Sequence, residues 1–210
     1  MRTLGTITNE GFSCVIKEDD DKRVFFKADA DIDADGANGQ NKAKPAYTTD
    51  NTGSELLANG GMAVVNGKVV CKYSWARDIV ILGKDNEPKV FGKNVVASRT
   101  WYQKPGISAN DPNAYLDSET ENYIVVPNLI IQNVDGIVRG CKARITYNGK
   151  NAWCVVGDKG PANKIGELSI AAARAVGIPS SPRTGGLETP EVLYEIWPGI
   201  AAEGYTLQKA

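Results

Sequence analysis

Short runs of apolar and β-branched residues dominate the chain, and Gly, Asn and Asp separate them. The runs are FSCVIK, RVFFKA, MAVVNGKVVCKY, DIVILG, NYIVVPNLIIQN, ARITYNG and NAWCVVG. Val, Ile, Phe and Tyr favour strands, whereas the separating residues favour turns. The pattern therefore predicts a mostly β protein whose strands are joined by turns.

Two Asn-Gly pairs mark tight hairpins. Asn66-Gly67 and Asn148-Gly149 each lie between two apolar runs. Asn-Gly suits the two-residue hairpin turn, in which both residues adopt positive φ angles. We therefore expect hairpins in VNGKVV and YNGKNAW.

One segment has a helical pattern instead. The Ala-rich stretch GELSIAAARAVGI predicts a short helix from about Glu167 to Ala175. Gly177 provides a stop for this helix, and Pro179 prevents its continuation. A weaker pattern, GSELLAN, predicts a second helix over residues 53–59.

Length and charge limit the classes of protein to consider. The 210 residues, 42% of them hydrophobic, suffice for one ordinary domain, so we expect residues 1–210 to form a single domain with residues 120–200 its most motif-rich part. Lys plus Arg is 24 and Asp plus Glu is 25, a net charge of -1, whereas nucleic-acid binding normally leaves a basic excess. We therefore expect no nucleic-acid partner.

Histidine is absent, which excludes His-based triads and His-ligated zinc, so any proton transfer falls to Asp, Glu, Lys, Tyr or Cys.

The cysteines and the apolar runs give information on the cellular compartment of the protein. The four cysteines form no CxxC motif, and their apolar neighbours indicate small buried core residues, with a disulfide between Cys141 and Cys154 as the alternative. No run approaches the roughly 18 apolar residues of a membrane helix, so we expect no membrane partner. The N-terminal residues show no apolar signal-peptide region, and the localisation stays open.

The stretch WCVVGDKGPANKIGEL carries the candidate chemistry. An apolar strand ending at Gly157 delivers Asp158 to its tip, and a turn containing Gly and Pro leads to Glu167 at the start of the predicted helix. We expect these two carboxylates at the rim of one cleft, an arrangement that suits glycoside hydrolysis because that reaction uses two carboxyl groups and needs no histidine or metal. The alternative is that Asp158 is a turn residue and Glu167 a first-turn helix residue facing the macrodipole.

The same stretch resembles the signature of the family 75 glycoside hydrolases, which are endo-chitosanases. The matching residues are Gly157, Asp158, Gly160, Gly166, Glu167 and Ser169. ADIDADGA, ENYIVVP and EVLYEIWPG resemble the family's Asp-rich segment, its strand ending in Pro and its closing strand. The turn and helix also resemble a double-psi β-barrel module. The resemblance implies a small closed, double-psi-like barrel with one short α-helix after the catalytic turn, and catalysis by Asp158 and Glu167. We take Asp158 as base and Glu167 as proton donor, although the residues alone leave these two roles interchangeable.

Residues 28–52 contain many Asp, Asn and Gly residues and predict a long acidic loop. Asp31, Asp33 and Asp35 have the spacing of an EF-hand loop, but Lys42 takes the position of its bidentate Glu, so we expect no metal. The segment is either a solvated loop tip or an anionic wall that holds a cationic sugar. The resemblance favours the second interpretation, with Asp33 and Asp35 binding substrate.

Aromatic residues complete the candidate site. Trp101 and Tyr102 lie in a strand-to-turn passage and are candidates for stacking on sugar rings, whereas Trp153 lies within an apolar strand and is predicted to be core. Lys159 and Lys164 flank the catalytic turn, and two cations there fit poorly with a polycationic substrate.

The resemblance implies an endo-acting, inverting hydrolase of the β-1,4-linked glucosamine polymer chitosan. We expect a monomer without a cofactor; the family resemblance suggests secretion, although no signal peptide is visible. One alternative is a peptidoglycan-degrading enzyme, such as a phage or secretion-system cargo. Another is a carbohydrate-binding barrel without activity, which the presence of both Asp158 and Glu167 argues against.

Overall fold

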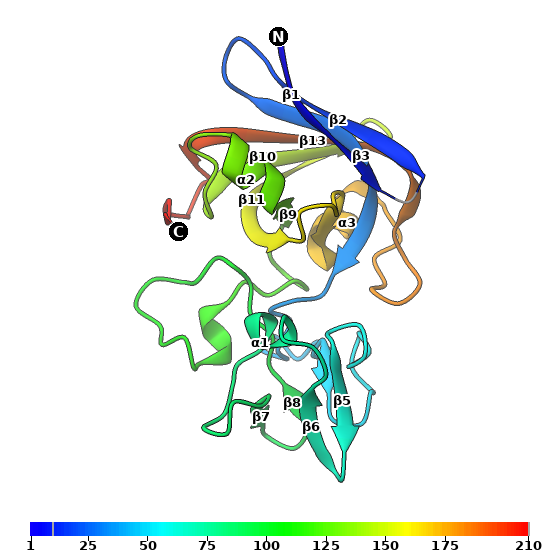
Figure 1. Ribbon diagram of the computed structural model, residues 1–210, viewed down its shortest axis with the longest axis vertical. Helices are drawn as coiled ribbons and strands as arrows, with labels where there is room; N and C mark the ends of the chain where they lie inside the picture. The colour runs from blue at the N-terminus through cyan, green and yellow to red at the C-terminus, as the bar shows by residue number, and fades with distance from the viewer. Residues whose placement is uncertain (10, 210) are drawn as a thin grey trace. The chain divides into compact units, whose positions relative to one another are not determined.

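The computed structural model describes residues 1–9 and 11–209, and the chain divides into two compact units (Figure 1). Unit 1 consists of Met1–Asp33 and Glu121–Ala210, and unit 2 consists of Ala34–Thr120. Unit 2 is thus an insertion between two strands of unit 1. The sequence predicts one domain for residues 1–210, and nothing in its pattern of apolar runs marks Asp33 as the point where a second unit begins.

Unit 1 is built mainly from strands. Its strands are β1 (Arg2–Asn9), β2 (Phe12–Glu18), β3 (Val24–Asp33), β9 (Tyr123–Pro127), β10 (Cys141–Tyr147), β11 (Lys150–Gly160), β12 (Glu167–Ser169) and β13 (Leu187–Ala201). Its helices, in the described residues, are α2 (Asn128–Asn133) and α3 (Ile170–Val176).

Six strands close into a barrel in the described part of unit 1. Their order is β3-β12-β9-β11-β10-β13, and β13 pairs with β3 to complete the ring. The pairs β3–β12 and β9–β11 are parallel, and the other neighbours in the ring are antiparallel. The β1–β2 hairpin extends the sheet beyond β3 (Figure 1). The predicted mostly β fold with a small closed barrel is confirmed.

Unit 2 has shorter elements. They are β4 (Tyr47–Thr48), β5 (Met62–Val65), β6 (Lys68–Cys71), α1 (Ala76–Ile79), β7 (Val90–Phe91), β8 (Val95–Val96) and a 3-10 helix, Pro112–Ala114. Buried residues gather around Ile81 and Tyr115, with Phe91 and Ile107 packed against them.

Both predicted hairpins are confirmed. Asn148 and Gly149 join β10 to β11, and Asn66 and Gly67 join β5 to β6. All four residues have positive φ, 46° and 75° in the first pair and 50° and 75° in the second. These angles explain the Asn-Gly sequence, because Asn and Gly tolerate the left-handed region best.

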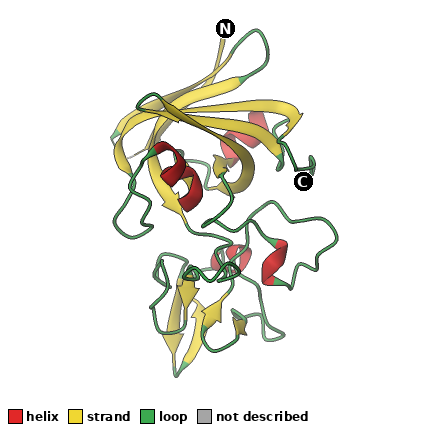
Figure 2. Ribbon diagram, turned by 180° about the vertical axis from the view of Figure 1, so that it is seen from behind, coloured by secondary structure: helices red, strands yellow, loops and turns green. Residues whose placement is uncertain are grey.

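The predicted helix forms, but it starts later than expected. The Ser169 side chain accepts a hydrogen bond from the Ala172 backbone N–H at 3.1 Å and so caps α3 at its N-terminus. Gly177, with a φ of 82°, ends the helix as predicted. The residues before the cap are not helical, because they pair with β3 and β9 as strand β12. Figure 2 shows the helices beside the curved strands of the barrel.

Two other predictions were wrong. The segment 53–59 forms turns rather than a helix, and Asn51 fixes one of them by accepting a hydrogen bond from the Leu57 backbone N–H at 2.9 Å. Residues 28–33, placed in the acidic loop by the sequence analysis, are the second half of β3. Their alternating Asp residues are compatible with a strand, since every second residue of a strand faces the same way.

The barrel core consists of aromatic and branched side chains from all sides of the ring. Phe26 and Tyr194 stack with ring centroids 5.1 Å apart, and Ile124, Ile145 and Val156 are fully buried. Among the described residues, no helix has the length and apolar character needed to cross a membrane.

The four cysteines are free thiols, so the alternative of a Cys141–Cys154 disulfide is wrong. Cys14, Cys141 and Cys154 are buried, as predicted, whereas Cys71 is partly exposed. Burial, with a further contribution from Asp29, raises the pKa of Cys14 to about 11, and burial raises that of Cys154 to about 12.

We therefore predict that Cys71 reacts first with a thiol reagent in the native protein at about pH 8. Burial and the nearby Glu87 raise the pKa of Cys71 as well, so its reaction is slow for a cysteine, but it alone is partly exposed. The measurement is the time course of dithiobis(nitrobenzoate) reaction, with Cys71→Ser as the control that removes the first phase. Rapid reaction of a second thiol before unfolding contradicts this account of the core.

Candidate functional site

Strand β9 places the two predicted catalytic carboxylates on either side of one residue. Val125 pairs with Asp158 of β11 in parallel register and with Glu167 of β12 in antiparallel register. Because neighbouring strands are about 4.8 Å apart, the Cα atoms of Asp158 and Glu167 are separated by about 10 Å. The two residues thus share one row across the sheet, although nine positions separate them in the sequence.

Both carboxylates lie on the same face of the sheet. Gly160 follows Asp158 by two positions on β11, so substituents on the two residues point the same way. A Cβ added at Gly160 would lie 3.0 Å from Glu167 Oε2 and 3.3 Å from Val125 Cγ1. The Glu167 side chain therefore reaches across β9 toward β11, the strand that carries Asp158. Gly160 allows this reach because it has no side chain.

Lys164 links Glu167 to a third carboxylate of the same row. Its Nζ lies 3.0 Å from Glu167 Oε1 and 3.1 Å from Asp31 Oδ2. Asp31 is in register with Glu167 on β3. Burial opposes the charge of Lys164, but Glu167 and Asp31 outweigh it and raise the lysine's pKa above its ordinary value. The ammonium is therefore a fixed positive charge between the two carboxylates.

Asp158 is more deeply placed than the sequence predicted. Strand β11 does not end at Gly157 but continues to Gly160, with an irregularity in its pairing between Val156 and Asp158. Only 8% of Asp158 is exposed, so it is not a rim residue as expected. Its Oδ1 accepts a hydrogen bond from the Lys159 backbone N–H at 2.7 Å. The Lys159 side chain is exposed.

Asp33, predicted to bind substrate, lies close to Asp158. Oxygens of the two carboxylates are within 4.8 Å of one another, and Asp33 ends β3 beside Ser169 of β12. Like charges at this separation repel, so a cation between these oxygens would be stabilised. Asp35, also predicted to bind substrate, is two residues further along the chain, partly exposed and in unit 2.

The turn before Glu167 requires a glycine. Gly166 has a φ of 99°, and a Cβ there would lie 2.1 Å from Asp29 Oδ1. The Gly166 carbonyl accepts a hydrogen bond from the Asp31 backbone N–H at 2.7 Å, which starts the pairing of β12 with β3. Gly166 therefore sets the position of Glu167 in the row, a role that its place in the motif did not reveal.

The aromatic residues singled out in the sequence differ in their exposure to solvent. Tyr102 is buried with 2% of its surface exposed, so it offers no face for a sugar, and its assignment is corrected. Trp101 is partly exposed in unit 2 and stays a stacking candidate. Trp153, predicted to be core, is 50% exposed, because it points away from the barrel interior while Cys154 points inward.

No protein-family model matches the chain, and no curated protein matches it either. The resemblance to family 75 therefore rests on the motifs quoted above. Sequence reasoning placed Asp31 in a loop and did not link it to Lys164, since their proximity comes from the register between β3 and β12. The alternation of Asp residues in ADIDAD is the signal that could have identified Asp31 as part of a strand face.

We predict that Lys164→Gln lowers the free energy of unfolding by about 1 kcal/mol, because it leaves Asp31 and Glu167 without their shared cation while the site stays partly solvated. Adding Asp31→Asn should cost less in the Lys164→Gln background than in the wild type. The measurement is urea unfolding of the four proteins, with Lys159→Gln as the exposed control. Equal costs of Asp31→Asn in both backgrounds contradict the bridge.

Proposed function

We propose that the chain is an endo-acting glycoside hydrolase that cleaves β-1,4-linked glucosamine polymers with inversion. The observation that carries the proposal is the row in which Asp158 and Glu167 flank Val125 on one face of the barrel sheet. Inverting enzymes hold their two carboxyl groups about 6.5–9.5 Å apart so that a water fits at the anomeric carbon. A backbone separation of about 10 Å, shortened by a side chain that reaches across β9, suits that range.

The surroundings of the two carboxyl groups support different roles for them. An ammonium 3.0 Å from Glu167 is a partner for an ionised carboxylate, and ionisation is what a base needs. The other carboxyl group of the pair, Asp158, is then the proton donor; it is buried, and the Asp33 carboxylate is nearby. We therefore assign Glu167 as base and Asp158 as proton donor, the reverse of the assignment made from the sequence.

The acidic row also supports a cationic substrate. Each glucosamine unit carries an ammonium, and Asp33 ends β3 with its carboxylate near that of Asp158. A negatively charged Asp33 at this position attracts a substrate ammonium. Lys164 does not repel a polycation as a free lysine would, because it forms ion pairs with Asp31 and Glu167.

The mechanism follows from these placements. Glu167 takes a proton from a water that attacks the anomeric carbon, and the bond to the leaving sugar breaks as Asp158 gives its proton to the glycosidic oxygen. The products are two shorter chains, and the new reducing end has the opposite anomeric configuration. Lys164 orients Glu167 through their ion pair, and Gly160 leaves room for that side chain.

The direct test is amide substitution of each carboxyl group. Asp158→Asn and Glu167→Gln should each lower turnover on chitosan by roughly 10²-fold or more, because each removes a positioned acid or base. Product formation is followed by chromatography, with chitin and purified sacculi as parallel substrates. Glu191→Gln, an exposed carboxylate of β13, is the matched control and should keep wild-type turnover. Near-normal turnover of either amide variant excludes this pair, and cleavage of sacculi alone favours a peptidoglycan enzyme.

Neutralising the acidic segment tests substrate binding separately. The double substitution Asp33→Asn and Asp35→Asn should raise the KM for chitosan more than it lowers kcat, because it removes attraction to the polycation. The difference in KM should shrink in high salt, since both side chains are partly exposed. Thermal unfolding serves as the control for the fold. An unchanged KM at low ionic strength would show that both residues belong to a solvated acidic segment that does not bind substrate.

A further inference from the structure

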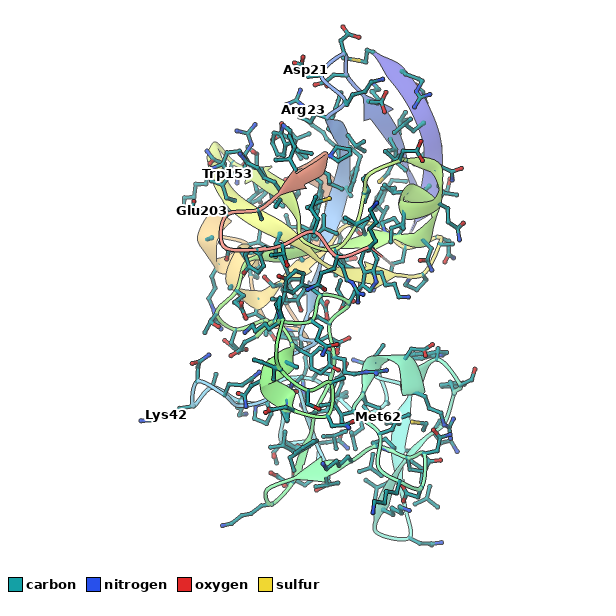
Figure 3. All side chains as sticks on the ribbon, turned by 90° about the vertical axis from the view of Figure 1, so that its left-hand side faces the viewer. Asp21, Arg23, Lys42, Met62, Trp153 and Glu203 are labelled. Carbon is teal, nitrogen blue, oxygen red and sulfur yellow. The ribbon has the colours of Figure 1, made fainter. Side chains whose placement is uncertain are left out.

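The outer face of the barrel has a pair of tryptophans, Trp153 and Trp197, of which the sequence predicted Trp153 to be core. Trp153 of β11 is half exposed, and its ring centroid lies 5.4 Å from that of Trp197 of β13, with the planes tilted by 50°. Strand β10 runs between these two strands. Figure 3 shows Trp153 on the outside of unit 1. Two adjacent aromatic rings at the surface, one half exposed and one partly exposed, form a candidate binding surface.

Two cations of β10 lie over these rings. Lys142 Nζ is 4.1 Å from the ring centroid of Trp153 and 5.5 Å from that of Trp197. The Arg144 guanidinium carbon is 5.2 Å and 5.7 Å from the same two centroids. Cation–π attraction at these distances holds both side chains against the rings, so the charges are in place before a ligand arrives.

The two cations differ in what else they bind. Arg144 makes two hydrogen bonds to the buried Glu195 carboxylate, Nε to Oε2 at 2.6 Å and Nη2 to Oε1 at 3.0 Å. Within the residues that the structure describes, no carboxylate forms an ion pair with Lys142. Lys142 therefore presents an ammonium that is fixed by aromatic rings and still able to bind an anion.

Further cations lie near Lys142 and Arg144. Register places Phe25, Glu195, Arg144 and Trp153 in one row across β3, β13, β10 and β11. Lys27 of β3 and Arg23, which directly precedes β3, alternate with Phe25, and the Arg23 guanidinium binds both Glu195 and Asp19. Glu195 and Asp19 thus neutralise only part of the positive charge of Arg23, Lys27, Lys142 and Arg144. The face carries the opposite charge to the row of Asp31, Glu167 and Asp158, so it does not suit a polycation.

We propose that this basic-aromatic face, formed by Lys142, Arg144, Trp153 and Trp197, binds an acidic polysaccharide. The tryptophan rings offer flat apolar surfaces to sugar rings, and Lys142 binds a carboxylate or sulfate group on the same chain. Nucleic acid offers the same charge and flat bases, but the net charge of the protein is -1, and nucleic-acid binding domains usually carry a clear basic excess. The proposal does not depend on hydrolase activity.

The experiment measures binding of oligogalacturonate, which carries carboxylates, and of dextran sulfate, which carries sulfates, by calorimetry on the full chain. Lys142→Gln and Trp153→Ala should each weaken binding by about tenfold. The matched controls are Lys89→Gln, whose ammonium lies 4.5 Å from the Phe91 ring centroid, and Trp75→Ala, whose side chain is 47% exposed. Both controls should bind as the wild type does.

The salt dependence of binding and a comparison with an oligonucleotide distinguish the possible outcomes. Binding should weaken strongly between low salt and about 0.5 M salt, because the charges are exposed. Trp153→Phe keeps a ring over which Lys142 can lie, so it should bind the polysaccharide more tightly than Trp153→Ala does. This difference would show that Trp153→Ala loses binding because it lacks the ring, and not because it unfolds. Absence of binding to both polymers at low salt overturns the proposal, as does an equal loss in the control variants. Tighter binding to a single-stranded oligonucleotide than to either polysaccharide overturns it in favour of nucleic acid.

Discussion

The candidate site depends on the pairing of β9 with a different strand on each side. A five-residue strand, Tyr123–Pro127, is buried along its whole length and pairs in parallel with β11 and antiparallel with β12. These two registers meet at Val125, and they alone bring Asp158 and Glu167 to the same row. A slip of one residue in either pairing would turn a carboxylate to the opposite face of the sheet, because side chains alternate along a strand.

The rest of the row follows from the pairing of β12 with β3. Asp31 then lies beside Glu167, and the repulsion between their carboxylates is relieved by Lys164. Gly166 permits this arrangement, since any side chain there would meet Asp29. The site is therefore a consequence of barrel closure as much as of the residues that carry the chemistry. Lys142 and Arg144 of β10 lie on another face of the barrel, away from the row of Asp31, Glu167 and Asp158.

Local features of the fold were predictable from the sequence. The Asn-Gly hairpins, the stop at Gly177 and the predominance of strands all depend on backbone preferences of single residues or pairs. The helix start was misplaced by three residues, because the Ser169 cap competes with an Ala-rich pattern that extends toward Glu167. The spacing of Asp158 and Glu167 identified a pair, but only the register of three strands shows that they share a face.

Long-range features were not predictable. Trp153 lies in an apolar run, which predicts a core position, yet its exposure depends on which face of β11 turns inward. The irregularity near Asp158 is also invisible in the sequence. The strand-to-turn passage around Tyr102 predicts a surface ring, but Tyr102 is buried. The partnership of Lys164 with Asp31 crosses more than a hundred residues, so no local pattern could reveal it.

The central claim is that two carboxyl groups flanking β9 hydrolyse a glucosamine polymer with inversion. Proton NMR of the products during the first minutes of chitosan hydrolysis tests it most directly, because the anomeric signals report the configuration before mutarotation mixes them. The account predicts that the α-anomer of the new reducing end forms first, since the linkage cleaved is β. Initial formation of the β-anomer, or no new reducing ends at all, would contradict it.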